Sequence, residues 1–178
     1  MRHLWIEVEL SNLTKLISVI DEQLSDTCRE SVKVEDADSF GYFDSAEHAV
    51  GLELVACQTY MAAVYGAIKL EKNQALEFGP KHHGGLTKVQ IINHAANYWK
   101  HSNEWALDRS AKRREAIELA FDSVGFSVGA DYPLSGILTE LTDPYLASLQ
   151  PIISILETWK AELQNEYVGN SLPLIGSL

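Results

Sequence analysis

The chain has 178 residues, of which 46% are hydrophobic and 22% are charged, a composition typical of one folded domain and not of a disordered chain. Its formal net charge of -11 on its face argues against a nucleic-acid partner. The two cysteines have no metal-type spacing, so neither a disulfide framework nor a cysteine-based zinc site is expected.

Hydrophobic periodicity predicts an all-α fold, a single helical-bundle domain over residues 1–178 with about five to seven helices and up-down connections. Its core is expected over residues 4–167, and residues 169–178 are expected to form an irregular tail. Charged residues interrupt any signal-peptide core near the start, and no apolar stretch is long enough to cross a membrane. We therefore expect a cytoplasmic protein without a membrane partner.

The first predicted helix begins at Leu4 or Ser11 and ends near Cys28, with an apolar stripe at intervals of three or four residues (Leu10, Leu13, Ile17, Ile20 and Leu24). An acidic loop over residues 31–42 follows. The next helix is expected to begin with Asp44 as its N-cap, to use Glu47 in a capping box and to reach about Lys72.

That second helix is apolar nearly all round, which is typical of a helix in the middle of a bundle. Its small residues, among them Gly51 and Gly66, predict that a neighbouring helix approaches closely. Residues 78–86 contain Pro80 and two glycines and are expected to be a connection. The adjacent His82 and His83 in this connection could lend one ligand to a metal, but no partner stands at a fixed spacing, so neither a metal nor a cofactor is expected.

The helix predicted over residues 87–108 is the stretch around which the chain is organised, with Thr87 and Gln90 forming a capping box. One side is an apolar arc that includes Ile91, Ile92, Ala95 and Ala96. The opposite side carries a polar stripe flanked by aromatic rings (Gln90, His94, Asn97, His101, Glu104 and Asp108, with Tyr98 and Trp105 at its border).

Three further helical segments are expected towards the C-terminus: residues 110–124, residues 133–141, and a helix that starts at Asp143 and Pro144 and is interrupted or kinked by Pro151. The short link before Ser110 predicts an antiparallel hairpin.

Positive charge is concentrated in the middle of the chain. Residues 81–114 contain seven Lys or Arg and two acids, a net charge of +5, which leaves -16 for the remainder. A basic patch on an acidic body can bind an anion while the body repels polyanions elsewhere. The alternative is a solvated hairpin whose cations pair with acids.

The polar stripe is the candidate site, with His94, His101 and Asn97 as its chemically active groups. Glu104 could orient the imidazole of His101 or raise its pKa, and Asn97 could hold a phosphate or hydroxyl. The alternative is that these residues only solvate the outer edge of an amphipathic helix.

The run QIINHAANYWKHSNEW, in an all-helical chain of this length, resembles HEPN-like helical domains over about residues 45–125. Several such domains are metal-independent RNases of toxin and phage-defence systems that act as dimers, with an Arg four to six residues before a His. No Arg stands in that position here, and the nearest equivalents are Lys88 before His94 and Asn97 before His101.

The resemblance implies a homodimer with RNA as its partner and no metal. His94 or His101 would act as general acid or base, and Lys88, Lys100 or Arg109 would stabilise the phosphorane charge. Tyr98 and Trp105 would contribute to substrate binding. The alternative function is a non-catalytic interaction module, a homodimer or partner-binding subunit whose Tyr98, Trp99 and Trp105 anchor a protein interface. A small-molecule pocket along the same aromatic edge is a third reading.

Overall fold

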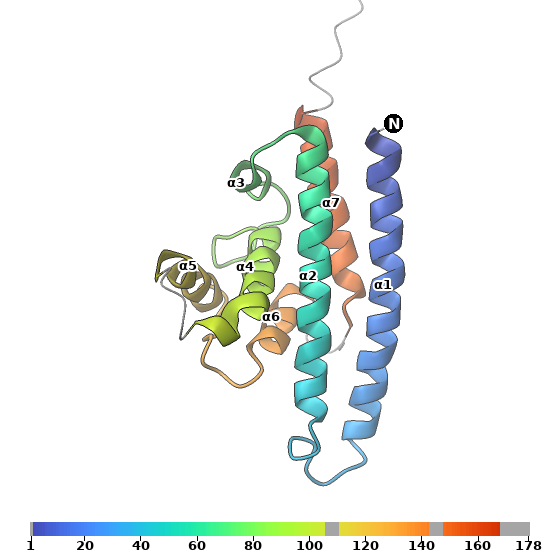
Figure 1. Ribbon diagram of the computed structural model, residues 1–178, viewed down its shortest axis with the longest axis vertical. Coiled ribbons are helices and arrows are strands. Elements are labelled where there is room, and N and C mark those ends of the chain that lie inside the picture. Colours follow the sequence, from blue (N-terminus) through green and yellow to red (C-terminus); the bar gives the residue numbers. More distant parts are fainter. Residues whose placement is uncertain (1, 106–110, 143–147, 168–178) are drawn as a thin grey trace, which may run out of the picture.

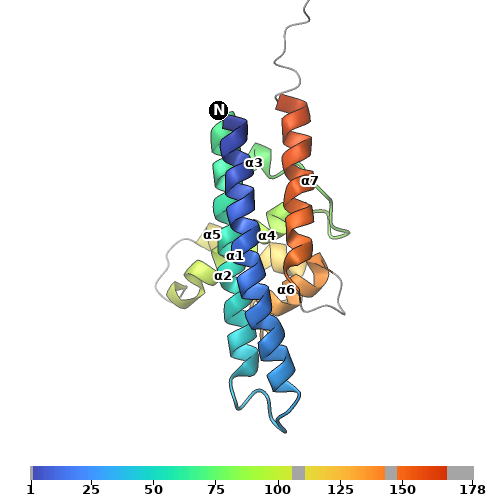
Figure 2. The same cartoon turned by 90° about the vertical axis from the view of Figure 1, so that its right-hand side faces the viewer.

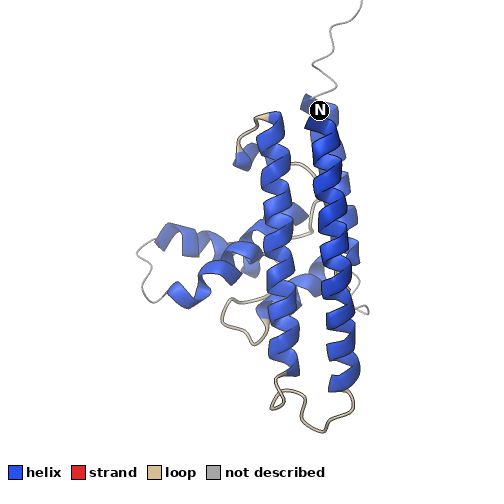
Figure 3. Ribbon diagram, turned by 45° about the vertical axis from the view of Figure 1, so that its right-hand side comes forward, coloured by secondary structure: helices blue, strands red, loops and turns tan. Residues whose placement is uncertain are grey.

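The computed structural model describes residues 2–105, 111–142 and 148–167. These residues form helices and no strand, which confirms the predicted all-α bundle (Figure 3). The helices are α1 (Arg2–Ser31), α2 (Tyr42–Ile68), α3 (Lys72–Ala75), α4 (Lys88–His101), the 3-10 turn η1 (Ser102–Glu104), α5 (Ala111–Asp122), α6 (Pro133–Leu141) and α7 (Gln150–Tyr167).

Three long helices run along the long axis of the molecule: α1, α2 and α7 (Figures 1 and 2). Helix α1 packs antiparallel against α2, and α7 lies beside both. The shorter helices α4, α5 and α6 lie on the side of α2 that faces away from α1 (Figure 1). Helix α2 therefore contacts elements on both of its sides, which explains why its sequence is apolar nearly all round.

The predicted stripe of α1 is confirmed, because Leu10, Leu13, Ile17 and Leu24 are buried in the core. On the other side of α2, a Cβ at Gly51 would overlap the ring of Trp99, so this glycine lets α4 approach closely. Helix α1 extends beyond its predicted bounds at both ends. None of the described helices has an apolar stretch of the length that crossing a membrane requires.

The predicted start of the second helix was wrong. Helix α2 begins two residues before Asp44, after Gly41, whose φ of 73° lies in the left-handed region. Glu47 does not complete a capping box; its carboxylate accepts hydrogen bonds from the backbone N–H groups of Leu134 and Ser135 at 2.7 and 2.8 Å. It therefore caps the N-terminus of α6, where a negative charge is favourable.

The connection between α2 and α4 contains the short helix α3 and is held at two points. The indole N–H of Trp159 donates to the carbonyl of Ala75 at 2.7 Å, and the hydroxyl of Thr87 donates to the carbonyl of Leu76 at 2.6 Å. The capping box between Thr87 and Gln90 is present as predicted. These contacts fix the end of α3 against α7 and against the start of α4.

Helix α4 is shorter than predicted, because it ends at His101 and not near residue 108. Ser102 and Asn103 follow in a 3-10 turn closed by a hydrogen bond from Trp105 N–H to the Ser102 carbonyl. Ser and Asn side chains compete for backbone groups and disfavour helix interiors, which accounts for the early end.

The C-terminal helices agree with the sequence in part. Helix α6 has the predicted bounds, Pro133–Leu141. Pro151 does not interrupt a helix but lies in the first turn of α7, where its missing N–H costs little. The predicted helix start at residues 143 and 144 and the predicted tail at residues 169–178 lie outside the described residues.

Candidate functional site

Gln58 of α2 connects several polar groups of α4. Its side-chain N–H group donates to Asn93 Oδ1 at 2.8 Å and to Asn97 Oδ1 at 3.0 Å. Its side-chain oxygen accepts a hydrogen bond from the ammonium of Lys100. Since Asn93 is buried, this network satisfies polar groups that the helix contact would otherwise leave unpaired.

Three cationic or titratable side chains gather beside this network: Lys72 of α3, and His94 and Lys100 of α4. We call them the cation cluster. Burial lowers the pKa of Lys72, and the charge of Lys100 lowers it further. Burial also lowers the pKa of His94, with a smaller effect from the charge of Lys72. Each shift shows that the protonated form is disfavoured by lost solvent and by like charge.

Among the described residues, no carboxylate contributes to the pKa shift of Lys72 or His94. The Nδ1 atom of His94 is buried and has no hydrogen-bond partner among the described residues. A buried polar atom without a partner is costly. The cation cluster is therefore suited to an anion that brings oxygen atoms to these groups.

The structure brings only some of the predicted catalytic residues together. His94 lies in the cation cluster, and Asn97 is joined to Lys100 through Gln58. His101 ends α4 and lies 3.5 Å from the carboxylate of Glu104, through Nδ1. That distance is at the limit of a hydrogen bond, and the Glu104 side chain is 69% exposed, so Glu104 orients His101 weakly.

Lys88 has a structural contact that the sequence did not predict. Its ammonium donates to the carbonyl of Leu141 at 2.9 Å, at the C-terminus of α6. A cation is favourable at this negative end of a helix. This contact accounts for the lysine at position 88 without any role in substrate binding.

The aromatic residues of the predicted border pack within the chain. The ring of Tyr98 contacts Trp105 edge to face and also contacts Phe121 of α5, and Arg114 lies over the Trp105 ring at 5.1 Å. Trp99 contacts the ring of His48. These contacts join α4 to α5 and α2, so they stabilise the fold.

A cavity of about 420 Å³ lies against the same border, but its charge is unsuitable for RNA. Its lining includes the rings of Tyr98 and Trp99 together with three acidic residues (Asp44, Glu47 and Asp131). Carboxylates repel phosphate, so an RNA contact is not expected at this cavity.

The third predicted cation, Arg109, lies outside the described residues. Lys112, which belongs to the basic segment but was not predicted as a site residue, is exposed on α5. Sequence reasoning missed Gln58 and Lys72. Lys72 carried no signal beyond its charge, and Gln58 was hidden in a helix that otherwise reads as apolar.

Comparison of the chain with protein-family models, with curated proteins and with solved structures gives no match. The function is therefore proposed from the site and from the sequence.

Proposed function

We propose that this chain is an RNA-binding protein of the HEPN-like helical type, with the cation cluster as its phosphate-binding site. The observation that supports this proposal is the gathering of Lys72, His94 and Lys100 from two helices with no acid contributing to the pKa shifts of the first two. The basic segment of the sequence and the resemblance to HEPN-like domains favour RNA as the anion.

The electrostatics of the cluster give the physical reason. Like charges in a partly desolvated place disfavour one another, and a bound phosphate reverses that effect by supplying negative charge and acceptor oxygens. Outside residues 81–114 the chain carries a net charge of -16 and repels polyanions, so binding is favoured where the basic segment contributes side chains. Each lysine that contacts a phosphate also makes affinity depend on salt concentration.

We propose binding and not cleavage, because acid–base cleavage of RNA uses one group to take a proton and another to give one. The cation cluster contains one imidazole, that of His94. His101 is at the end of the same helix, beside the carboxylate of Glu104. A ribonuclease of the type expected from the sequence would need the second group from elsewhere.

The experiment measures binding of a fluorescent single-stranded RNA by anisotropy at two or more salt concentrations. We expect Lys72→Met and Lys100→Met each to weaken binding about three- to tenfold and to lower the salt dependence by roughly one phosphate contact. Lys112→Met is the matched control, because Lys112 is an exposed lysine of the same basic segment outside the cluster. Unchanged binding in both cluster variants, or an equal loss in the control, would contradict the proposal.

A second assay separates binding from cleavage. A mixed RNA pool is incubated with the wild type and with His94→Ala in the presence of EDTA. We expect neither protein to cleave it. Cleavage by the wild type that disappears in His94→Ala would show that the chain is a metal-independent RNase, and the binding-only proposal would be wrong.

A second candidate function, self-association, is favoured by an apolar stripe on the outer face of α1. Trp5, Val8, Leu16 and Val19 are between 46% and 66% exposed, although they are large hydrophobic residues. With the exposed Asn12 between them, their spacing is three, four, four and three residues. This order is the same in both directions.

A spacing of this kind suits an antiparallel contact with a second copy of the chain. A two-fold axis at Asn12 would place Trp5 opposite the partner's Val19, Val8 opposite the partner's Leu16, and the two Asn12 amides opposite each other. We propose this stripe, and not the aromatic border of α4, as the interface of a homodimer. A central Asn would fix the register.

Oligomeric mass from sedimentation or light scattering tests this candidate. Leu16→Asp and Val19→Asp should convert a dimer into a monomer, since each places a charge in the apolar contact. The matched control is Val32→Asp, an exposed valine outside the stripe. A monomeric wild type at high micromolar concentration, or a dimer that survives both stripe variants, would exclude this interface.

A further inference from the structure

The loop before α4 holds two adjacent histidines in a defined backbone conformation. The N–H of His82 donates to the carbonyl of Leu86 at 2.8 Å, and the N–H of Gly85 donates to the carbonyl of His82 at 3.0 Å. Residues Lys81 and Thr87 form an isolated β-bridge across the base of the loop. The histidines are therefore held at fixed places before any ligand is present.

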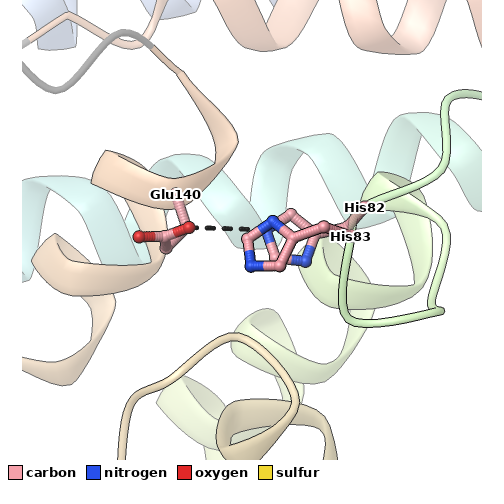
Figure 4. A group of neighbouring side chains, drawn as sticks. All are labelled: His82, His83 and Glu140. Atoms are coloured by element: carbon pink, nitrogen blue, oxygen red, sulfur yellow. Dashed lines mark ion pairs between the residues drawn. The ribbon is translucent and has the colours of Figure 1, made fainter.

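Glu140 from the last turn of α6 faces these histidines (Figure 4). Its Oε2 lies 3.4 Å from Nε2 of His82, and the two imidazole rings are tilted by 39° to each other with centroids 3.9 Å apart. One potential ligand atom from each of the three residues lies within 4.8 Å of the others. The group joins a loop to a helix that is more than fifty residues away in the sequence.

His82 shows a second feature that points to a ligand. Its side chain is only 3% exposed, and within the part of the chain that the structure describes its Nε2 makes no hydrogen bond. The approach to Glu140 is too poorly formed to satisfy this buried atom. A buried nitrogen aimed at a carboxylate and a second imidazole is an arrangement that a cation completes.

We propose that His82, His83 and Glu140 form a site for a divalent transition-metal ion, with zinc as the best fit. Two imidazoles and one carboxylate are a known zinc ligand set, and they leave a fourth position for water. Nitrogen ligands favour zinc over magnesium or calcium, which prefer oxygen. The exposed His83 gives an ion access from solvent.

The ring of His82 must change its tautomer when the ion binds. The N–H of Gly84 donates to Nδ1 of His82 at 3.1 Å, so Nδ1 carries a lone pair and the neutral ring has its proton on Nε2. Binding through Nε2 needs that lone pair, so the proton moves to Nδ1 and the Gly84 hydrogen bond is lost. Zinc affinity is lowered by this loss.

This requirement gives the site a spectroscopic signature. Nitrogen-15 NMR of the ring distinguishes the two tautomers. We expect the Nε2–H form of His82 in the zinc-free chain and the Nδ1–H form in the zinc-bound chain. No change of tautomer at saturating zinc would overturn ligation through Nε2.

Zinc binding itself is measured by calorimetric titration of the full chain, after removal of any affinity tag and treatment with EDTA. We expect one zinc ion per chain, a higher melting temperature because the ion ties the loop to α6, and no comparable effect of magnesium. His83→Ala removes an exposed ligand, and Glu140→Gln preserves side-chain shape, so both variants should remain folded. Each should weaken zinc binding at least tenfold.

The matched control is the His101 and Glu104 pair, in which an imidazole and a carboxylate lie 3.5 Å apart and no third ligand joins them among the described residues. His101→Ala and Glu104→Gln should leave zinc binding unchanged. Absence of stoichiometric zinc binding, or binding that survives both His83→Ala and Glu140→Gln, would overturn the proposal. The RNA-binding variants lie in another cluster, so the two proposals fail or succeed independently.

Discussion

The buried carboxyl group of Glu53 gives the fold a pH dependence that can be measured. Glu53 lies on α2, is 0% exposed, and neither of its oxygens has a hydrogen-bond partner among the described residues. Burial, with a smaller contribution from the charge of Asp21, raises its pKa from 4.5 to about 9. The folded chain therefore holds a proton on Glu53 at neutral pH, while the unfolded chain does not.

The sign and size of the effect follow from this difference. Between pH 4.5 and 9 the unfolded chain binds fewer protons at Glu53 than the folded chain, so stability is complete at the acidic end and falls as pH rises. Each rise of one pH unit lowers the free energy of unfolding by about 1.4 kcal/mol, so about 3 kcal/mol is lost by pH 7. The side chain in Glu53→Gln cannot ionise, so the free energy of unfolding of this variant should not show this fall with pH.

Urea unfolding of the wild type and Glu53→Gln at pH 5.5, 7 and 8.5 tests the reasoning. We expect the difference in free energy of unfolding to move in favour of Glu53→Gln by about 1.4 kcal/mol per pH unit, whatever its value at the lowest pH. Glu104→Gln serves as control, because the Glu104 side chain is largely exposed. Parallel pH profiles for the wild type and Glu53→Gln would refute a protonated, buried Glu53.

Four further substitutions test the packing and the contacts that hold the site in place. Glu47→Gln should lower the free energy of unfolding by about 1–3 kcal/mol in urea titrations, because the Glu47 carboxylate caps α6 with charge-assisted hydrogen bonds. Gly51→Ala should lower the melting temperature, since its methyl group would overlap Trp99, whereas Gly66→Ala has open space and should raise it. Lys88→Met should lower the free energy of unfolding by about 1 kcal/mol, because it removes the contact at the end of α6, and should leave RNA affinity within twofold. Full stability of Glu47→Gln would contradict the cap of α6, and equal effects of the two glycine variants would contradict the close approach of Trp99. A large loss of RNA binding in Lys88→Met would contradict the structural role of Lys88.

The sequence predicted those features that depend on residues close together in the chain. The stripe of α1, the capping box of Thr87 and the bounds of α6 follow from local spacing and from turn chemistry. The end of α4 was missed because its aromatic pattern continues past His101, while Ser102 and Asn103 disfavour a continuous helix.

The sequence could not predict which distant side chains meet. Glu47 has a capping-box spacing from Asp44, yet its carboxylate binds α6, because the packing of α6 on α2 brings free N–H groups to it. Gln58 and Asn97 are 39 residues apart, and their contact depends on the rotation of α4 against α2. Helical spacing identifies a face but not its partner.

The same limit applies to the two clusters of the functional account. His94 was expected from the sequence, but Lys72 joins it only because the hydrogen bond from Thr87 to Leu76 fixes the end of α3 beside the start of α4. His82 and His83 were noted without a third ligand, and Glu140 reaches them through the packing of α6.

The pKa of His94, measured by NMR titration with and without a short RNA, tests the central proposal most directly. In the free chain, burial and the charge of Lys72 should hold this pKa below 6.5. A phosphate bound in the cation cluster should raise it, since negative charge favours the imidazolium. A His94 pKa that stays the same at saturating RNA would contradict the account.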